Sequence, residues 1–294
     1  MTGWWVIVNP SAGRGRDLTG QVEAALQQRG IPFETRTSAS ANAISGLIRE
    51  GRGEGYRQFG AVGGDGTANL VLNGLLADPW TEPPTLGILP AGSGSDFVRT
   101  FAIPNDLDGG ADHLVGGERY PVDVGLMTGS FGERYFLNAA NAGLAARTVV
   151  DAGHLPDWMG SRRYLAGFWT ALARTKPAPV EVESDGRTIS TVAWNVVVAN
   201  GQFFGGGMNV APRAATMDGL FDVQVFSGPR RVAPVVIRRV VRGTHLTHRA
   251  VRRTTGGSIS VGVPDDWMIE ADGEIFGTGS VAAKIVPGVV NFKI

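Results

Sequence analysis

Carboxylates and hydroxyl groups are the side chains of this sequence that could do chemistry. The run Gly63-Gly-Asp-Gly-Thr67 places Asp65 inside a glycine turn, and two further acidic runs follow, Met217-Asp-Gly-Leu-Phe-Asp222 and Ile269-Glu-Ala-Asp-Gly-Glu274. Carboxylates can bind Mg²⁺ or take a proton from a hydroxyl, and together with hydroxyl side chains they suit phosphoryl transfer. Each later run is equally typical of a plain turn beside a strand.

Other kinds of active site find little support. The chain has no cysteine, and its histidines stand at positions 113, 154, 245 and 248, outside any nucleophile motif. His245 and His248 are three residues apart, but no third zinc ligand lies near them in the sequence. Gly13-Arg-Gly15 lacks the last glycine of a dinucleotide-binding turn, and no Gly-Lys-Ser/Thr run occurs. A bound phosphate would therefore contact main-chain N–H groups, hydroxyls, and Arg14 or Arg16.

The glycine turn around Asp65 lies between a strand and a helix. Phe59–Val62 is a short apolar run of strand type, and Leu72, Leu75 and Leu76 recur at helical spacing. Glycine lets the main chain approach a ligand closely, and the first turn of a helix presents unpaired N–H groups with partial positive charge. The arrangement favours a phosphate, and a carboxylate at that place favours a cation or a transferable proton beside it.

The first 120 residues or so predict an α/β domain. Four apolar strands alternate with helices, namely Trp4–Val8, Phe33–Thr37, Phe59–Val62 and Thr85–Leu89. This alternation indicates a parallel sheet that is covered on both faces. Because the glycine-rich turns follow strands, they should meet at the carboxyl edge of the sheet, where such folds bind ligands.

The pattern changes near Tyr120 to short alternating strands, one of them over residues 135–139, which predict an antiparallel β-sandwich. Asp185-Gly186 is a typical hairpin turn between two of these strands. Two helices, about 161–174 and 230–242, should interrupt the sandwich. We expect a nucleotide-binding α/β domain over residues 1–122, to which residues 287–294 can return, and a β-sandwich substrate domain over residues 123–286.

Composition limits the class of protein. The 294 residues are 43% hydrophobic and 18% charged with a net charge of zero, which fits a globular protein and gives no support to bulk nucleic-acid binding. No run approaches the ~18 apolar residues that a membrane span needs, and no signal peptide is evident. Since cysteine is absent, we expect a reducing compartment and a cytoplasmic protein.

The motifs in their order resemble the diacylglycerol kinase catalytic-domain family, the bacterial lipid kinases related to sphingosine and ceramide kinases. Gly-Gly-Asp-Gly-Thr alone is shared with NAD kinases and phosphofructokinases, but the opening Asn-Pro-Ser-Ala-Gly and the closing Asp-Gly-Glu sharpen the resemblance. The matching stretches span nearly the whole chain: 9–13, 63–69, 87–97, 200–212, 218–222 and 270–274.

The resemblance implies a kinase with an NAD-kinase-like, Rossmann-like three-layer domain and a β-sandwich domain, using ATP and Mg²⁺ and receiving its lipid in a cleft between the domains. It implies that Glu274 is the base for the lipid hydroxyl and that Asp65 lies in the facing network of Mg²⁺ and water. A further Mg²⁺ would be held by the Asp218 carboxylate and by the carbonyls of Ala215 and Leu220. The residues implied to line the ATP site are Asn9, Pro10, Ser11, Ala12, Gly13, Thr37, Gly63, Gly64, Asp65, Gly66, Thr67, Ala68, Asn69 and Ser93.

The sequence departs from the family pattern at one place. Where the family usually has Gly-Thr-Gly-Asn-Asp, this chain has Gly92-Ser-Gly-Ser-Asp96. Ser93 keeps a hydroxyl for the nucleotide, whereas Ser95 replaces an amide. We therefore expect a reduced or altered nucleotide preference rather than a loss of activity.

A lipid kinase must also reach a bilayer, so we expect peripheral contact at the inner membrane face. Eight arginines lie between residues 230 and 253, and a basic helix there would favour an anionic surface, although a solvated basic face on a structural helix fits equally. Diacylglycerol is the default lipid by resemblance only, and oligomeric state stays open, with a homodimer as one arrangement. Two alternatives stand beside the lipid kinase: a kinase of a soluble substrate such as NAD, and a nucleotide-binding regulator without catalysis.

Overall fold

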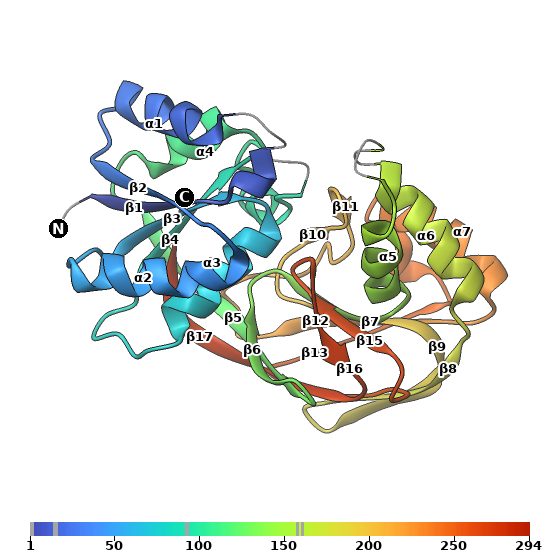
Figure 1. Cartoon of the computed structure of the whole chain (residues 1–294). Helices are drawn as coiled ribbons and strands as arrows, with labels where there is room; N and C mark the ends of the chain where they lie inside the picture. The colour runs from blue at the N-terminus through green and yellow to red at the C-terminus, as the bar shows by residue number, and fades with distance from the viewer. Residues whose placement is uncertain (1–2, 14–16, 92–93, 157–158, 160–161) are drawn as a thin grey trace. The chain divides into compact units, whose positions relative to one another are not determined.

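The computed structural model describes residues 3–13, 17–91, 94–156, 159 and 162–294 (Figure 1). The chain forms two compact units, the first made of Met1–Val124 with Pro287–Ile294 and the second of Gly125–Val286. Two long strands, β5 (Arg119–Gly129) and β17 (Val281–Lys293), contribute residues to both units. The first unit is therefore discontinuous in sequence.

A parallel sheet forms the centre of the first unit. Its strands are β1 (Trp4–Val8), β2 (Phe33–Thr37), β3 (Gln58–Gly63) and β4 (Thr85–Pro90), in the spatial order β4-β3-β1-β2. The end of β17 extends this sheet, since Asn291 and Phe292 pair in parallel with Thr85 and Leu86 of β4. All five residues of β1 are buried, which is the pattern of a parallel strand covered on both faces.

Helices cover both faces of this sheet (Figure 1). On one face lie α1 (Leu18–Gln28) and α4 (Leu107–Leu114), which pack with Trp4, Val6 and Val8 in one apolar cluster. On the other lie α2 (Ile44–Gly53) and α3 (Asp65–Leu76). Three short 3₁₀ helices complete the unit: η1 (Pro10–Gly13), η2 (Ala41–Ala43) and η3 (Phe97–Phe101).

The second unit is an antiparallel β-sandwich. Its main sheet runs in the order β16-β15-β7-β9-β8-β14-β17, with β12 pairing β9 and β13, and with β6 pairing β5. The strands are β6 (Gly132–Phe136), β7 (Ala139–Gly143), β8 (Ala178–Ser184), β9 (Arg187–Ala199), β12 (Phe221–Ser227), β13 (Val251–Gly256), β14 (Ser258–Gly262), β15 (Met268–Ala271) and β16 (Glu274–Thr278), and β10 (Phe203–Phe204) and β11 (Met208–Asn209) form a separate ribbon.

Two apolar clusters stabilise the second unit. The sandwich interior contains the stacked pair Phe136 and Phe221, whose ring centroids are 5.6 Å apart. The second cluster lies on the outer face of β9 and β12, where Trp194 and Phe226 pack against the helices. The helical segments of this unit are α5 (Leu144–Gly153), α6 (Arg162–Arg174), η5 (Arg230–Val232), α7 (Ala233–Val240) and η6 (His245–Thr247).

The structure confirms the predicted fold class, an α/β domain followed by an antiparallel sandwich. Two local predictions were wrong. The strand expected over residues 135–139 is divided into β6 and β7, because backbone N–H groups at the break donate to Asp272. A third helix, α5, also interrupts the sandwich.

Within the described residues, no helix is long and apolar enough to cross a membrane.

Candidate functional site

The turns at the carboxyl edge of the first sheet come together, as the sequence predicts. Asn9, which follows β1, donates its side-chain amide to the hydroxyl of Thr67 on α3, at 2.9 Å. The backbone N–H of Asp65 donates to the carbonyl of Gly94 at 2.7 Å, and that of Ala91 donates to Gly63 at 3.2 Å. The loops after β1, β3 and β4 are thus hydrogen-bonded to one another around the first turn of α3.

Two glycines in the Gly63–Thr67 turn are required by this close packing. A Cβ atom at Gly64 would come within 2.5 Å of the carbonyl oxygen of Gly94, and one at Gly63 would overlap the side chain of Thr67. Any side chain at residue 64 would therefore push the loops after β3 and β4 apart. The glycines keep the main chain close around the helix N-terminus, where backbone N–H groups and the helix dipole favour an anion.

Asp65 has a structural role that the sequence did not reveal. Its carboxylate accepts hydrogen bonds from the backbone N–H groups of Asp96, at 2.9 Å, and Phe97, at 3.1 Å. These bonds fasten the start of η3 to the start of α3. Asp65 thus holds the loop after β4 at the N-terminal end of α3.

Ser95 supports the same loops from inside the protein. The residue is fully buried, and its hydroxyl donates to the carbonyl of Gly63 at 2.8 Å. The neighbouring Ser93, which the resemblance implies is a nucleotide contact, lies outside the described residues, as do Arg14 and Arg16. The hydroxyl of Ser95 therefore bonds the glycine turn rather than pointing to solvent.

The remaining residues implied for the nucleotide lie around this edge. Pro10, Ser11, Ala12 and Gly13 form η1, and the N–H of Ser11 donates to the Asn9 side chain at 3.1 Å. Thr37, at the end of β2, has its hydroxyl 3.2 Å from that of Thr19. Gly66, Thr67, Ala68 and Asn69 lie in the first turns of α3, where Thr67, Ala68 and Asn69 are buried. Buried residues at a helix start shape the site rather than offer it free side chains.

Glu274 begins β16 in the second unit, directly after the Asp272-Gly273 turn. Its side chain is exposed. Partial loss of hydration near the protein surface raises the pKa of this carboxyl, and the positive charge of Arg134 acts in the opposite direction. A raised pKa makes a carboxylate a better proton acceptor near neutral pH.

Two buried carboxyl groups lie beneath this turn. Asp272 accepts hydrogen bonds from the backbone N–H groups of Leu137, Asn138 and Ala139, at 2.6, 2.9 and 3.1 Å. Glu270 accepts from the Gly273 N–H at 2.6 Å and from the Asn141 side chain at 2.8 Å. Burial raises the pKa of Glu270 to about 7, and these two hydrogen bonds only partly offset that effect.

The acidic run at residues 217–222 divides into an exposed and a buried carboxylate. Asp218 is exposed and accepts the N–H of Leu220 at 3.0 Å, whereas Asp222 is buried and paired with Arg253 at 2.7 Å. In the part of the chain that the structure describes, no cluster of three or more His, Cys, Asp and Glu side chains could hold a metal. A cation near Asp218 would therefore need backbone carbonyls as further ligands.

Comparison with known proteins assigns both units. Residues 138–293 match the family model of the YegS C-terminal NAD kinase beta sandwich-like domain, and residues 3–127 match that of the diacylglycerol kinase catalytic domain. The chain belongs to the family of the YegS C-terminal domain and carries a diacylglycerol kinase catalytic domain. This membership makes the chain a lipid kinase by family.

Relatives in the family align along nearly the whole chain. A protein named diacylglycerol kinase from Bacillus subtilis (strain 168) is 28% identical over 277 residues, which cover 92% of this chain and 89% of the relative. A protein from Yersinia enterocolitica named "probable lipid kinase YegS-like" is 24% identical, covering 98% of this chain and 96% of the relative. The sequence alignment thus includes both units.

Solved structures support the fold. The crystal structure of a diacylglycerol kinase from Bacillus anthracis str. Sterne has a TM-score of 0.73 at 21% identity, covering 99% of this chain and 96% of that chain. Another crystal structure from the same organism has a TM-score of 0.82 at 22% identity, covering 99% and 95%. At these identities, the likeness concerns the fold alone.

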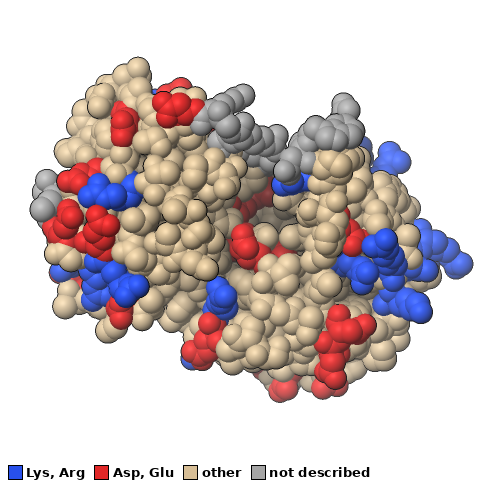
Figure 2. All heavy atoms as spheres, in the orientation of Figure 1, with Lys and Arg blue, Asp and Glu red and all other residues tan. Residues whose placement is uncertain are grey.

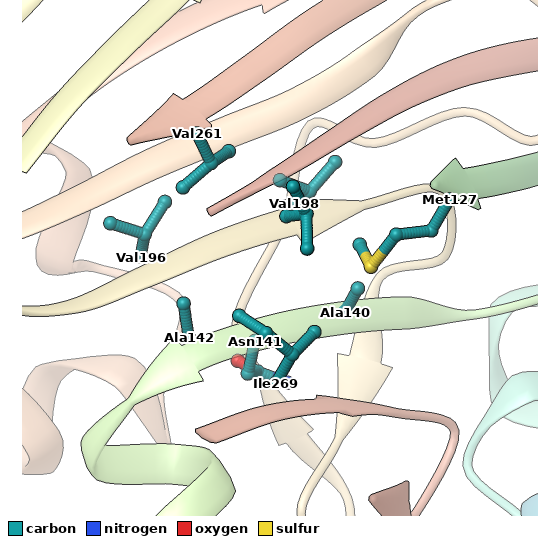
Figure 3. Close-up of a pocket in the computed structure, with 9 residues that line it drawn as sticks. Met127, Ala140, Asn141, Ala142, Val196, Val198, Val261 and Ile269 are labelled. Atoms are coloured by element: carbon teal, nitrogen blue, oxygen red, sulfur yellow. The ribbon is translucent and has the colours of Figure 1, made fainter. Parts of the chain in front are cut away.

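A small cavity lies inside the sandwich of this family member (Figure 3). Its volume is about 10 Å³, which is close to the space that one water needs. It is lined by Met127, Ala140, Asn141, Ala142, Val196, Val198, Val261, Ile269 and Val281. A cavity of this size has no room for an acyl chain without movement of the surrounding side chains.

The sequence did not predict the hydrogen bond between Asn141 and Glu270, and it indicated Asp272 only as a turn residue. Their contacts join residues about 130 positions apart. The one local signal was polar residues inside otherwise apolar strands, at Asn141 in an alanine-rich run and at Glu270 after Ile269. Such residues, when buried, need hydrogen-bond partners.

Proposed function

We propose that this lipid kinase transfers the γ-phosphate of ATP, with Mg²⁺, to the hydroxyl of a diacylglycerol-like lipid. The observation that carries the proposal is the hydrogen-bonded convergence of the loops after β1, β3 and β4 on the N-terminus of α3. That edge offers main-chain donors and a positive helix end for the phosphates, and Asp65 lies at the same place.

The residues of the first unit fit a nucleotide with its cation. Asn9, Gly64 and Thr67 would line the phosphates, with main-chain N–H groups close to them because the glycines carry no side chain. Asp65 would lie beside the Mg²⁺, because its carboxylate is a hard oxygen ligand of the kind that this cation prefers and begins the helix at this edge. When bound, Mg²⁺ offsets the charge on the transferred phosphate.

Glu274 would act as the general base for the lipid hydroxyl. It is an exposed carboxylate with a raised pKa, on a turn that is held from beneath. A hydroxyl nucleophile needs positioning and a proton acceptor within hydrogen-bond reach. A second Mg²⁺ would be held at the exposed Asp218 with the carbonyls of Ala215 and Leu220, a set of hard oxygen ligands of the kind that Mg²⁺ prefers.

The test is transfer of labelled phosphate from ATP to a panel of lipids in mixed micelles. Wild-type protein should label a lipid with a free hydroxyl, and Glu274→Ala should lose ~100-fold or more of kcat. Glu133→Ala, which removes another exposed glutamate of the same unit, is the matched control and should behave as wild type. Labelling of NAD or another soluble substrate instead of lipid would refute the proposal. ATP binding with no transfer at all would favour a regulator.

Membrane contact is part of the proposal. Arg238 and Arg239 on α7 and Arg242 just after it are exposed, and Figure 2 shows basic side chains gathered where Figure 1 draws α6 and α7. On α6, Leu165 and Trp169 are 62% and 51% exposed, one helical turn apart. Exposed apolar side chains beside arginines are typical of helices that lie on anionic bilayers. Arg230 does not belong to this surface, because it donates to the C-terminal carbonyls of α6.

Co-sedimentation with liposomes tests this surface. The triple variant Arg238→Glu, Arg239→Glu, Arg242→Glu should bind phosphatidylglycerol vesicles more weakly than wild type, because each basic residue near an anionic surface contributes ~1 kcal/mol. Arg49→Glu, at an exposed arginine on α2, is the control. Equal sedimentation of the triple variant and wild type would exclude α7 as the docking surface, and the same preparations give the oligomeric state by light scattering.

A further inference from the structure

Asn141 and Glu270 lie opposite each other on neighbouring strands. They are register partners in the β7–β15 pair, and the Asn141 side-chain amide donates to Glu270 Oε2 at 2.8 Å. Their strand neighbours Ala140 and Ile269 belong to the sandwich interior. Both side chains are buried, with 4% and 5% exposure.

Glu270 reaches forward from its strand to the turn that follows. Its Oε1 accepts the backbone N–H of Gly273 at 2.6 Å. Asp272 and Gly273 are the two central residues of this turn, and both have positive φ, +51° and +87°. Such angles suit a tight hairpin turn, for which Asp-Gly is a preferred pair, and contacts from the side chain of residue 272 give the turn further support.

That support comes from the segment between β6 and β7. Asp272 accepts three backbone N–H groups there, from Leu137, Asn138 and Ala139. The side chain of Asn200 also fixes this segment, because it donates to the carbonyl of Leu137 at 2.7 Å. Two carboxyl groups thus hold the turn. That of Glu270 accepts the backbone N–H of Gly273, and that of Asp272, the first residue of the turn, accepts the three N–H groups of the neighbouring segment.

Glu274 is the next residue along the chain. We propose that Glu270 and Asp272 are positioning residues, which fix the Asp272-Gly273 turn and thereby the place of the Glu274 carboxylate. The proposal rests on the proposed function, in which Glu274 is the base for the acceptor hydroxyl. Neither Glu270 nor Asp272 contacts the substrate in this scheme.

The chemistry of position 270 favours a positioning role over simple packing. A buried acid is costly, and a well-packed apolar residue is often neutral or stabilising in its place. An apolar residue, however, could not accept the N–H of Gly273, and that N–H would lose its partner. The charged groups that act on Glu270 are Asp272 and Glu274, and both raise the pKa of this carboxyl, so a neutral acceptor fits the site as well as a charged one.

Conservative and truncating variants separate these roles. Glu270→Gln keeps the oxygen that accepts Gly273 N–H, and the Asn141 amide can turn so that its oxygen faces the new N–H₂ group. It should keep kcat within about 3-fold of wild type, whereas Glu270→Ala should lower kcat by about 10-fold or more with KM for ATP unchanged. Asp272→Asn tolerates the same backbone angles but loses one acceptor, and it should also lower kcat rather than raise KM for ATP.

A double-mutant cycle with Glu274 is the decisive experiment. If Asp272 acts through Glu274, the double variant Asp272→Asn, Glu274→Gln should be no slower than Glu274→Gln alone, because the group being positioned is already gone. Multiplying effects in the double variant, or loss of ATP binding in Asp272→Asn, would overturn the proposal. Glu133→Gln combined with Glu274→Gln is the control pair.

Hydrogen exchange of the turn gives a readout that does not need activity. The amides of residues 273–275 should exchange at least 10-fold faster in Glu270→Ala and in Asp272→Asn, while the amides of β1 in the other unit stay at wild-type rates. Unchanged exchange at the turn would overturn the positioning role. A wild-type protein that phosphorylates no lipid would refute the proposed function, and the exchange data would still decide whether these residues hold the turn.

Discussion

Glu270 should make the stability of this protein depend on pH in a direction opposite to that of most acids. The pKa of the buried carboxyl is about 7 in the folded protein, against 4.5 without burial. Between these values the folded state binds the proton and the unfolded state does not. The stabilisation is therefore fully present below pH 4.5 and is lost as the pH rises through 7. At ~1.4 kcal/mol for each pH unit, the whole loss is about 3 kcal/mol.

The assay compares wild type with Glu270→Gln, which is neutral at every pH. Urea unfolding of both proteins at pH 5 and at pH 8 gives four free energies of unfolding. Wild type should lose about 3 kcal/mol relative to the variant over this interval. The buried His245, whose pKa is lowered by desolvation, also makes stability depend on pH, but it is present in both proteins and cancels in the difference. Glu183→Gln, at an exposed position on β8, is the matched control and should parallel wild type.

Two outcomes would refute the reasoning about Glu270. If wild type and Glu270→Gln change stability in parallel from pH 5 to pH 8, the folded protein does not raise the pKa of Glu270. If wild type gains stability relative to the variant, the folded protein holds Glu270 as a carboxylate, and its hydrogen bonds to Asn141 and Gly273 outweigh its burial.

Three further predictions follow from the contacts of the two units. Gly64→Ala should force the loops after β3 and β4 apart, because its Cβ would meet the carbonyl of Gly94; we expect a cost of ~1–3 kcal/mol in urea unfolding and a raised KM for ATP, and an unchanged KM would contradict the loop contact. Ser95→Ala should lose ~1 kcal/mol, since it removes a buried hydrogen bond to Gly63; equal ATP and GTP kinetics in wild type and Ser95→Asn would count against an effect of this residue on nucleotide preference. Arg253→Leu should leave Asp222 buried without its cation and destabilise the protein by ~3 kcal/mol in urea, whereas a wild-type midpoint would mean that Gln224 alone satisfies that carboxylate.

Local patterns were enough to predict the first unit. The five apolar residues of β1 indicate a buried strand, and the spacing of Leu72 and Leu75 indicates a helix. The glycine turns come directly after strands in the sequence. The convergence of those turns needed no contact information, because parallel strands end at a common edge. The second role of Asp65, as acceptor for η3, could not be predicted, since it depends on where a separate loop passes.

The second unit was predictable in class but less so in detail. Asp272-Gly273 and Asp185-Gly186 indicate hairpin turns by composition alone, and both adopt positive φ. The break between β6 and β7 could not be read from residues 135–139, which look like a continuous strand. It is caused by a carboxylate more than 130 residues away in the sequence. Helix α5 was missed because its short segment packs by contacts with strands that are distant in sequence.

The shared strand β17 has a consequence for the order in which the chain acquires its structure. Phe292 is fully buried in the first unit, where its ring lies 5.1 Å from that of Phe97 and 4.8 Å from that of Phe101 on η3. A ribosome delivers this residue only after every residue of the second unit. Because domains usually fold as units during synthesis, the later unit can finish before the earlier one. The sheet of the first unit, although encoded first, is then completed by a strand that is made after the second unit.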